Sequence, residues 1–258
     1  MPTPLDILLD PISLSLLALY LVLILLEALF PARDLPKAKH WKTRTFCSFM
    51  LFFYLSSYLP LLWDTYFLPY QLIDLSHVNP LLGAFAGLLV FNFLLYWWHR
   101  AIHKFTFLWR VFHQFHHSAE RVDAYGAFYF SPMDIIAFTF LGSVALVLLV
   151  GLSAQAASLY LYASMFLPIF QHMNVRTPTW LGYIIQRPES HSIHHKKGVH
   201  AHNYADLPIF DIIFGTFKNP ASFEKEAGYY LGASSRIAEM LLCRDVSKPK
   251  QTESHQGA

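Results

Sequence analysis

Three short histidine motifs are the residues of this 258-residue chain best suited to chemistry. They hold eight of its 14 histidines and read His99-Arg-Ala-Ile-His103, His113-Gln-Phe-His116-His117 and His191-Ser-Ile-His194-His195. Residues three and four apart share one face of an α-helix, so each motif aims two or three imidazoles in one direction. Neutral imidazole is a good ligand for iron and zinc. We therefore predict a shared metal site, and the alternative is a set of unrelated surface histidines.

The number of imidazoles indicates two metal ions. Eight exceed what one ion accepts, because a catalytic zinc takes only three protein ligands plus water. Two ions with four or five imidazoles each fit better, and all-nitrogen ligation favours iron, zinc, copper or nickel over magnesium or calcium. We expect two iron ions, since a redox metal gives a membrane protein a reason for so large a cluster. Zinc stays the alternative.

The remaining histidines have weaker claims to a ligand role. His172 stands at the expected end of an apolar span, at the depth of the motifs, and we expect it to be a ninth ligand; a hydrogen-bonded core residue is the alternative. His200 and His202 follow the third motif in a loop, where the choice lies between a ligand and a neighbour of a ligand or a surface residue. Solvated positions are expected for the last three, His40, His77 and His255.

Several common catalytic motifs are absent from the sequence. The first histidine pair lacks the glutamate of the H-E-x-x-H zinc proteases, and there is no G-x-S-x-G, P-loop or G-x-G-x-x-G. The chain therefore lacks a nicotinamide or flavin site of that type, and reducing equivalents must come from a partner.

The composition indicates an integral membrane protein. Hydrophobic residues make up 55% and charged residues 14%, against about 45–50% and about 25% in soluble domains. Stretches long enough to span a bilayer lie near 12–30, 46–68, 81–98, 133–151 and 155–174. The last two form a tight helical hairpin, or in the weaker alternative a re-entrant pair. We predict an all-α polytopic bundle of four to five spanning helices with a cytosolic histidine-rich helical cap.

The basic residues assign the sides of the membrane. With five spans and the N-terminus outside, the inner segments 31–45, 99–132 and 175–258 contain five, four and ten Lys and Arg, which are all 19. This distribution follows the positive-inside rule and places every histidine motif and the C-terminus in the cytoplasm. The first eleven residues contain no Lys or Arg, so we expect no signal peptide and a retained first span.

We divide the chain into N-terminal membrane helices with a basic loop at 1–80, a core at 81–220 and a cytosolic tail at 221–258. The residues from 248 onward are polar and expected to be disordered. The apolar segment 207–217 is too short to span and is expected at the interface or over the metal site. Cys47 and Cys243 show no metal-binding spacing and are expected to be free thiols.

The path between the first two motifs must bend. A straight helix would separate His103 from His113 by roughly 15 Å, too far for ligands of one compact centre. We therefore expect a break between Lys104 and Arg110, followed by a second helix that starts before His113 and is capped by Thr106.

The order and spacing of the motifs resemble the fatty acid hydroxylase/sterol desaturase superfamily of integral membrane di-iron oxygenases. The resemblance covers roughly residues 85–220. It is supported by the segments Phe107-Leu-Trp-Arg-Val-Phe-His113, Gln171-His-Met-Asn174, Asn203-Tyr and Asp211-Ile-Ile-Phe-Gly-Thr-Phe217.

The resemblance implies a non-haem di-iron centre, dioxygen as the oxidant and a sterol or fatty acyl chain that is hydroxylated or desaturated. An external ferredoxin or cytochrome-type reductase system would supply electrons, and no nucleic acid is expected as a partner. The alternatives are a membrane haem electron carrier and a metal transporter or sensor, which would place His, Asp or Glu near the midplane. Ligand roles are implied for His99, His103, His113, His116, His117, His191, His194 and His195, and also for His172.

Overall fold

The computed structural model describes residues 1–249, so the expectations for His255 and for the tail from residue 250 lie outside the described residues. The helices are α1 (Pro4–Leu9), α2 (Pro11–Leu29), α3 (Trp41–Phe67), α4 (Pro80–Lys104), α5 (Thr106–Leu108), α6 (Gln114–His117), α7 (Pro132–Ser143), α8 (Ala154–His172), α9 (Pro188–His194), α10 (Ile209–Ile213) and α11 (Ile237–Leu241). The strands are β1 (Ile73–Leu75) and β2 (Val150–Leu152).

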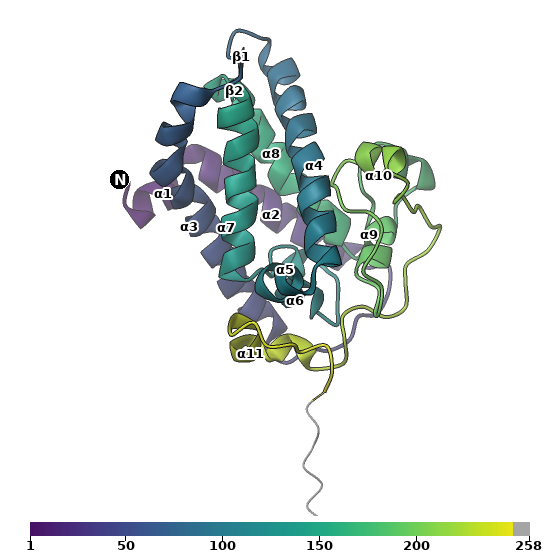
Figure 1. Ribbon diagram of the computed structural model, residues 1–258. Helices are drawn as coiled ribbons and strands as arrows, with labels where there is room; N and C mark the ends of the chain where they lie inside the picture. The colour runs from purple at the N-terminus through teal and green to yellow at the C-terminus, as the bar shows by residue number, and fades with distance from the viewer. Residues whose placement is uncertain (250–258) are drawn as a thin grey trace, which may run out of the picture.

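The all-α bundle predicted from the sequence is confirmed. Among the described residues, four helices are long and apolar enough to cross a membrane: α2, α3 with its extension to Tyr70, α4, and α7 with its π-helical extension to Leu149. The fifth predicted stretch forms α8, which packs against α4 and α2 but is not one of these four. Helix α4 packs against both α7 and α8, and Figure 1 shows α8 behind the other two.

Polar residues followed by proline set where the long helices begin. The side chains of Asp10, Asn79 and Ser131 each accept a backbone N–H of the first turn, and proline is the first residue of each helix. Proline suits this position because its missing N–H would have no partner there. Ser153 caps α8 in the same way without a proline. These caps make each apolar stretch start at a defined residue.

A short parallel pair of strands ties together two connections at one end of the bundle. β1 precedes α4, and β2 joins the π-helical end of α7 to α8; Ile73 pairs with Val150 and Leu75 with Leu152. The connection between α7 and α8 is short, as predicted, but the two helices do not pack together as a tight hairpin: α8 packs against α4 and α2, and the strand β2 in the connection was not predicted. Figure 1 shows the strands at the opposite end of the bundle from α5 and α6.

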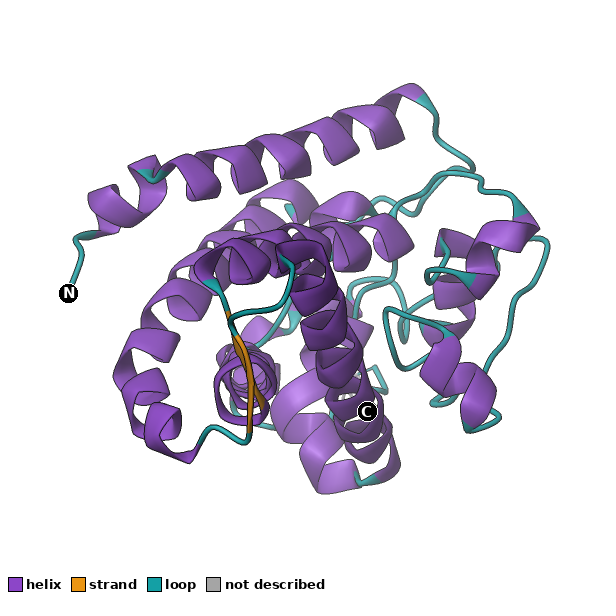
Figure 2. Ribbon diagram, turned by 90° about the horizontal axis from the view of Figure 1, so that it is seen from above, coloured by secondary structure: helices purple, strands orange, loops and turns teal. Residues whose placement is uncertain are grey.

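The N-terminal helices close one side of the bundle. In Figure 2, α1 and α2 follow the labelled N-terminus and run across the view along this side. The core here is aromatic: Tyr20 of α2 lies 4.4 Å from Phe49 of α3 between ring centroids, and Phe128 packs against both.

The segment after residue 220 returns to the bundle. Met240 and Val246 are buried with Trp41 of α3 and Phe115 of α6, and Trp41 donates from Nε1 to the buried carboxylate of Asp123 at 3.0 Å. Up to residue 249 the C-terminal segment is therefore part of the folded protein. Cys47 and Cys243 are free and exposed, as predicted.

Candidate metal centre

The chain bends immediately after α4, as predicted. Phe105 has extended backbone angles (φ −103°, ψ 116°), and the helical residues resume at Thr106. The predicted capping role of Thr106 is wrong. The non-helical residue that defines the cap is Phe105, one position earlier, and no side chain caps α5.

A π-helical turn then carries the first ligand candidate of the second motif. Trp109–His113 forms this turn, and the N–H of Gln114 bonds to the carbonyl of Trp109, five residues back. Such turns are rare in proteins as a whole, but those that occur are frequently found at functional sites. The turn brings Nε2 of His113 to 2.9 Å from Nε2 of His99 in α4.

All nine predicted ligand residues are brought together and buried in two groups. Within each group, one ring nitrogen from every histidine lies within 4.8 Å of the others. The groups draw on α4, the α5–α6 segment, α8 and α9, so no motif forms a group alone. The first group is His99, His103, His113, His117 and His194, and the second is His116, His172, His191 and His195.

Backbone carbonyls fix the tautomers of three of these imidazoles. Nδ1 of His99 lies 2.7 Å from the carbonyl oxygen of Tyr204. Nδ1 of His172 lies 2.6 Å from that of Pro168, and Nδ1 of His194 lies 2.8 Å from that of His202. Because a carbonyl only accepts, each Nδ1 carries the proton and each Nε2 presents a bare lone pair.

A carboxylate does the same for His113. Its Nδ1 lies 3.0 Å from Oδ2 of Asp134, and both side chains are fully buried. With Asp134 ionised, Nδ1 of His113 carries the proton, and Nε2 points its lone pair at the lone pair of His99 Nε2, 2.9 Å away. Neither nitrogen donates a hydrogen bond in this arrangement, and a cation bound by both removes the repulsion.

The spacing of the remaining nitrogens fits the same interpretation. Nε2–Nε2 distances are 3.1 Å for His117 and His194, 3.0 Å for His116 and His172, and 3.1 Å for His172 and His191. Two nitrogens bound at about 2.1 Å lie about 3.0 Å apart when the bond angle is 90°, and about 3.4 Å apart in a tetrahedron. The donor set therefore fits metal ions with near-right-angle ligation.

Burial keeps the imidazoles neutral. Desolvation lowers the pKa values of His116, His194 and His195 well below the usual range, and neighbouring histidines add to this effect. Both ring nitrogens of His103 are buried without a partner among the described residues. Neutral, unpartnered imidazoles are the form that binds metals.

The other described histidines lie outside the two groups. His200 is exposed, with its ring 4.5 Å from that of Trp109, and is outside both groups. His202 supplies its carbonyl oxygen to His194 and also lies outside the groups. His40 and His77 are exposed, as expected.

Sequence reasoning missed the groups that orient the rings. The carbonyls of Tyr204, Pro168 and His202 carry no side-chain signal, so no sequence pattern reveals them. Asp134 was visible as the third residue of a span, after Ser131-Pro132. A carboxylate in an apolar stretch was the signal available for it.

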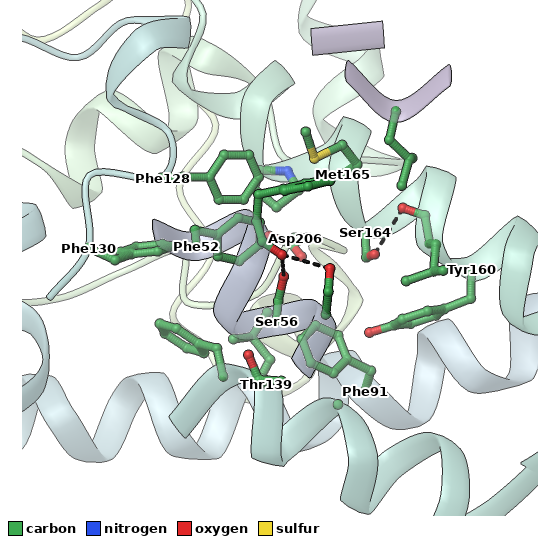
Figure 3. Close-up of a pocket in the computed structure, with 18 of the residues that line it drawn as sticks. Phe52, Ser56, Phe91, Phe128, Phe130, Thr139, Tyr160, Ser164, Met165 and Asp206 are labelled. Carbon is green, nitrogen blue, oxygen red and sulfur yellow. Dashed lines mark hydrogen bonds between the residues drawn. The ribbon is translucent and has the colours of Figure 1, made fainter. Parts of the chain in front are cut away.

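A largely apolar cavity of about 640 Å³ leads to the histidine groups. It lies among α2, α3, α4, α7 and α8, and His99, His113 and His172 line its inner end. Phe52, Phe128 and Phe130 form part of its wall, as Figure 3 shows. The cavity has the shape and polarity for an acyl chain or a ring system.

Comparisons with known proteins agree with these features. The chain is 30% identical over 165 residues to ornithine lipid hydroxylase OlsE of Rhizobium tropici, covering 61% of this chain and 47% of that protein. It is 29% identical to very-long-chain aldehyde decarbonylase GL1-5 of Oryza sativa subsp. indica, covering 56% of this chain and 23% of that protein.

A third relative is sphinganine C4-monooxygenase 1 of Arabidopsis thaliana, 27% identical with 54% of this chain and 55% of that protein covered. The matches thus span between a quarter and about half of these relatives. No solved structure shows a significant match. The fatty acid hydroxylase family model matches residues 84–216, which contain all nine clustered histidines. The chain belongs to the fatty acid hydroxylase family.

Proposed function

We propose that this protein is a membrane-bound di-iron oxygenase that hydroxylates a lipid within its apolar cavity. The observation that carries the proposal is the convergence of bare imidazole lone pairs in two buried groups at the inner end of that cavity. Two of the similar proteins, a lipid hydroxylase and a sphinganine monooxygenase, support a lipid substrate and hydroxylation over desaturation.

The proposed reaction needs electrons from outside the chain. A lipid C–H bond, dioxygen, two electrons and two protons give a C–OH group and water. When bound, two ferrous ions supply the reduction of dioxygen and the power to break an unactivated C–H bond. An external one-electron carrier of the ferredoxin or cytochrome type supplies the electrons.

The protein itself binds, orients and excludes water. The two histidine groups hold one ion each, and the carbonyls of Tyr204, Pro168 and His202 keep the rings turned inward. The aromatic wall of the cavity binds the lipid chain and keeps water from the reacting carbon. Iron is favoured over zinc because the nitrogen spacing fits right-angle ligation and zinc has no redox chemistry.

The two alternatives fit the geometry less well. In each group the rings contact one another directly, with centroids 4.7 Å apart for His103 and His117 and 4.3 Å for His172 and His191. This leaves no space for a porphyrin between them. A transporter would carry its ligands near the midplane, whereas these lie at one end of the bundle.

The test combines lipid analysis with metal analysis. Membranes containing the protein, given ¹⁸O₂ and a reductase chain, should incorporate ¹⁸O into a lipid, and omission of the reductase should abolish the product. His103→Ala and His172→Ala should each lower bound iron from about two ions per chain to about one or fewer. His77→Ala, an exposed histidine outside both groups, is the control. Full iron content in both variants contradicts the proposed site. The absence of any ¹⁸O-labelled lipid contradicts the proposed function.

A further inference from the structure

Tyr160 and Asp206 interrupt the apolar wall of the cavity, and each has a polar atom to which no described residue bonds. Tyr160 of α8 is 5% exposed, and no described residue forms a hydrogen bond with its hydroxyl. Asp206 is 6% exposed; Oδ1 accepts from Nε2 of Gln171 at 2.8 Å, and no described residue bonds to Oδ2. Figure 3 shows both around the same pocket, with the Tyr160 hydroxyl directed into it.

Asp206 lies beside the metal centre without being part of it. Its partner Gln171 immediately precedes His172 in α8, and Asp206 follows Tyr204, whose carbonyl bonds to His99, by two residues. The backbone carbonyl of Asp206 accepts from the N–H of Gln186, which fixes the position of the residue. The polar pair is therefore a built feature of the inner cavity.

We propose that Tyr160 and Asp206 form a polar subsite for a lipid whose hydrogen-bond donor, a hydroxyl or an amide N–H, enters the cavity close to the carbon that is oxidised. The inference rests on the proposed function and narrows its substrate class from any acyl chain to lipids with such a donor. The carboxylate oxygen accepts from the donor, and the Tyr160 hydroxyl donates to the oxygen of the same polar group.

The energetics favour this occupant over a plain hydrocarbon. A polar atom that faces an apolar cavity is poorly solvated, and a hydrogen bond from the ligand stabilises it. Burial raises the pKa of Asp206 to about 7, which reflects how poorly the carboxylate is solvated. A hydrocarbon would leave both polar atoms without a partner, so the site discriminates against it.

Binding can be measured without turnover, on iron-loaded protein in nanodiscs with no electron donor, at a pH well above 7, where Asp206 is ionised and only accepts hydrogen bonds. The probes are 1-octadecanol, stearamide and 1-methoxyheptadecane, an isomer of the alcohol that only accepts hydrogen bonds. We expect the alcohol or the amide to bind about tenfold more tightly than the ether, and the stronger of the two identifies the donor. Equal affinity for all three overturns the inference.

Two variants test the residues themselves. Asp206→Asn turns an amide N–H toward the cavity while its oxygen still accepts from Gln171, so the preference should reverse in favour of the ether. Tyr160→Phe should weaken binding of both the alcohol and the ether, because the hydroxyl donates to the oxygen of either probe. Ser164→Ala is the matched control, because this cavity hydroxyl already bonds to the carbonyl of Leu161. An unchanged preference in Asp206→Asn, or unchanged affinity of both probes for Tyr160→Phe, overturns the assignment.

The outcomes separate this inference from the proposed function. Labelled lipid without any donor preference refutes the polar subsite and leaves the oxygenase standing. A donor preference without oxygen-dependent product refutes the oxygenase and leaves the subsite standing.

Discussion

At the scale of residues, the centre depends on what lies behind each imidazole as much as on the imidazole itself. A carbonyl or carboxylate that accepts a hydrogen bond from Nδ1 leaves the lone pair on Nε2. The same hydrogen bond holds the ring in place independently of a metal on Nε2. His113 differs from the other oriented rings, because its partner is the buried carboxylate of Asp134. In the proposed centre this carboxylate would support His113 as a metal ligand.

Replacement of Asp134 by Asn should weaken metal binding through His113. The shape is kept, but the charge is lost, and changes of this kind cost roughly 10–100-fold in metal affinity. The measurement is iron retained by the purified protein against a series of chelator concentrations. Asp64→Asn is the control, since Asp64 lines the same cavity from α3 and contacts no clustered histidine. Equal iron retention in the two variants would show that Asp134 does not support the site.

At the scale of elements, the bend after α4 and the π-helical turn convert a linear motif order into a compact site. The break at Phe105 returns the chain toward α4, and the turn sets the direction of His113. The segment 227–232 then lies over the loop after α6. The N–H of Gly228 bonds to the carbonyl of His195, and the N–H of Gly232 bonds to Glu120.

Gly228→Ala should loosen the packing of the segment 227–232 over the loop after α6 and lower thermal stability. Gly228 has φ +71°, and a Cβ there would lie 2.5 Å from the carbonyl oxygen of Ala119. The backbone strain alone costs of order 1–3 kcal/mol, and the clash moves the loop next to His117. Gly198→Ala is the matched control, with φ +74° and no atom within 4 Å of the added Cβ. The melting temperature and the iron content of Gly228→Ala should fall below those of the control. Equal values would show that the packing of this segment does not support the histidine groups.

At the scale of the whole molecule, the two ends of the bundle are chemically different. One end carries the strand pair and a connection, 69–80, without Lys or Arg. The other carries α5, α6 and the histidine groups, together with basic segments (Figure 1). We infer from the positive-inside rule that the histidine end faces the cytoplasm, where a soluble electron carrier is available.

Reporter fusions test this orientation. A reporter that works only in the cytoplasm should be active when fused after Ala258. The same reporter inserted at 76–79, between β1 and α4, should be inactive, because this connection lies on the opposite side. A reporter before Met1 should also lie outside if α2 crosses the membrane. A C-terminal reporter outside the cytoplasm would invert the orientation and place the histidine groups away from the proposed electron donor.

The sequence by itself determined the composition of the site and the class of the fold. Helical spacing within each histidine motif and the lengths of the apolar stretches are local properties, so they are readable without coordinates. The bend between Lys104 and Arg110 also followed, because a straight helix is too long for one centre. The ligand role of the nine histidines remains a proposal for metal analysis to test.

Only the tertiary structure decided how the histidines divide and what they face. The second motif splits between the two groups, with His113 and His117 in one and His116 in the other, because neighbouring positions on a helix point to different neighbours across the bundle. The strand pair, the carbonyls behind the rings, and the placing of Tyr160 and Asp206 on one cavity bring together residues far apart in the chain. Such contacts depend on packing between elements, which no local pattern in the sequence encodes.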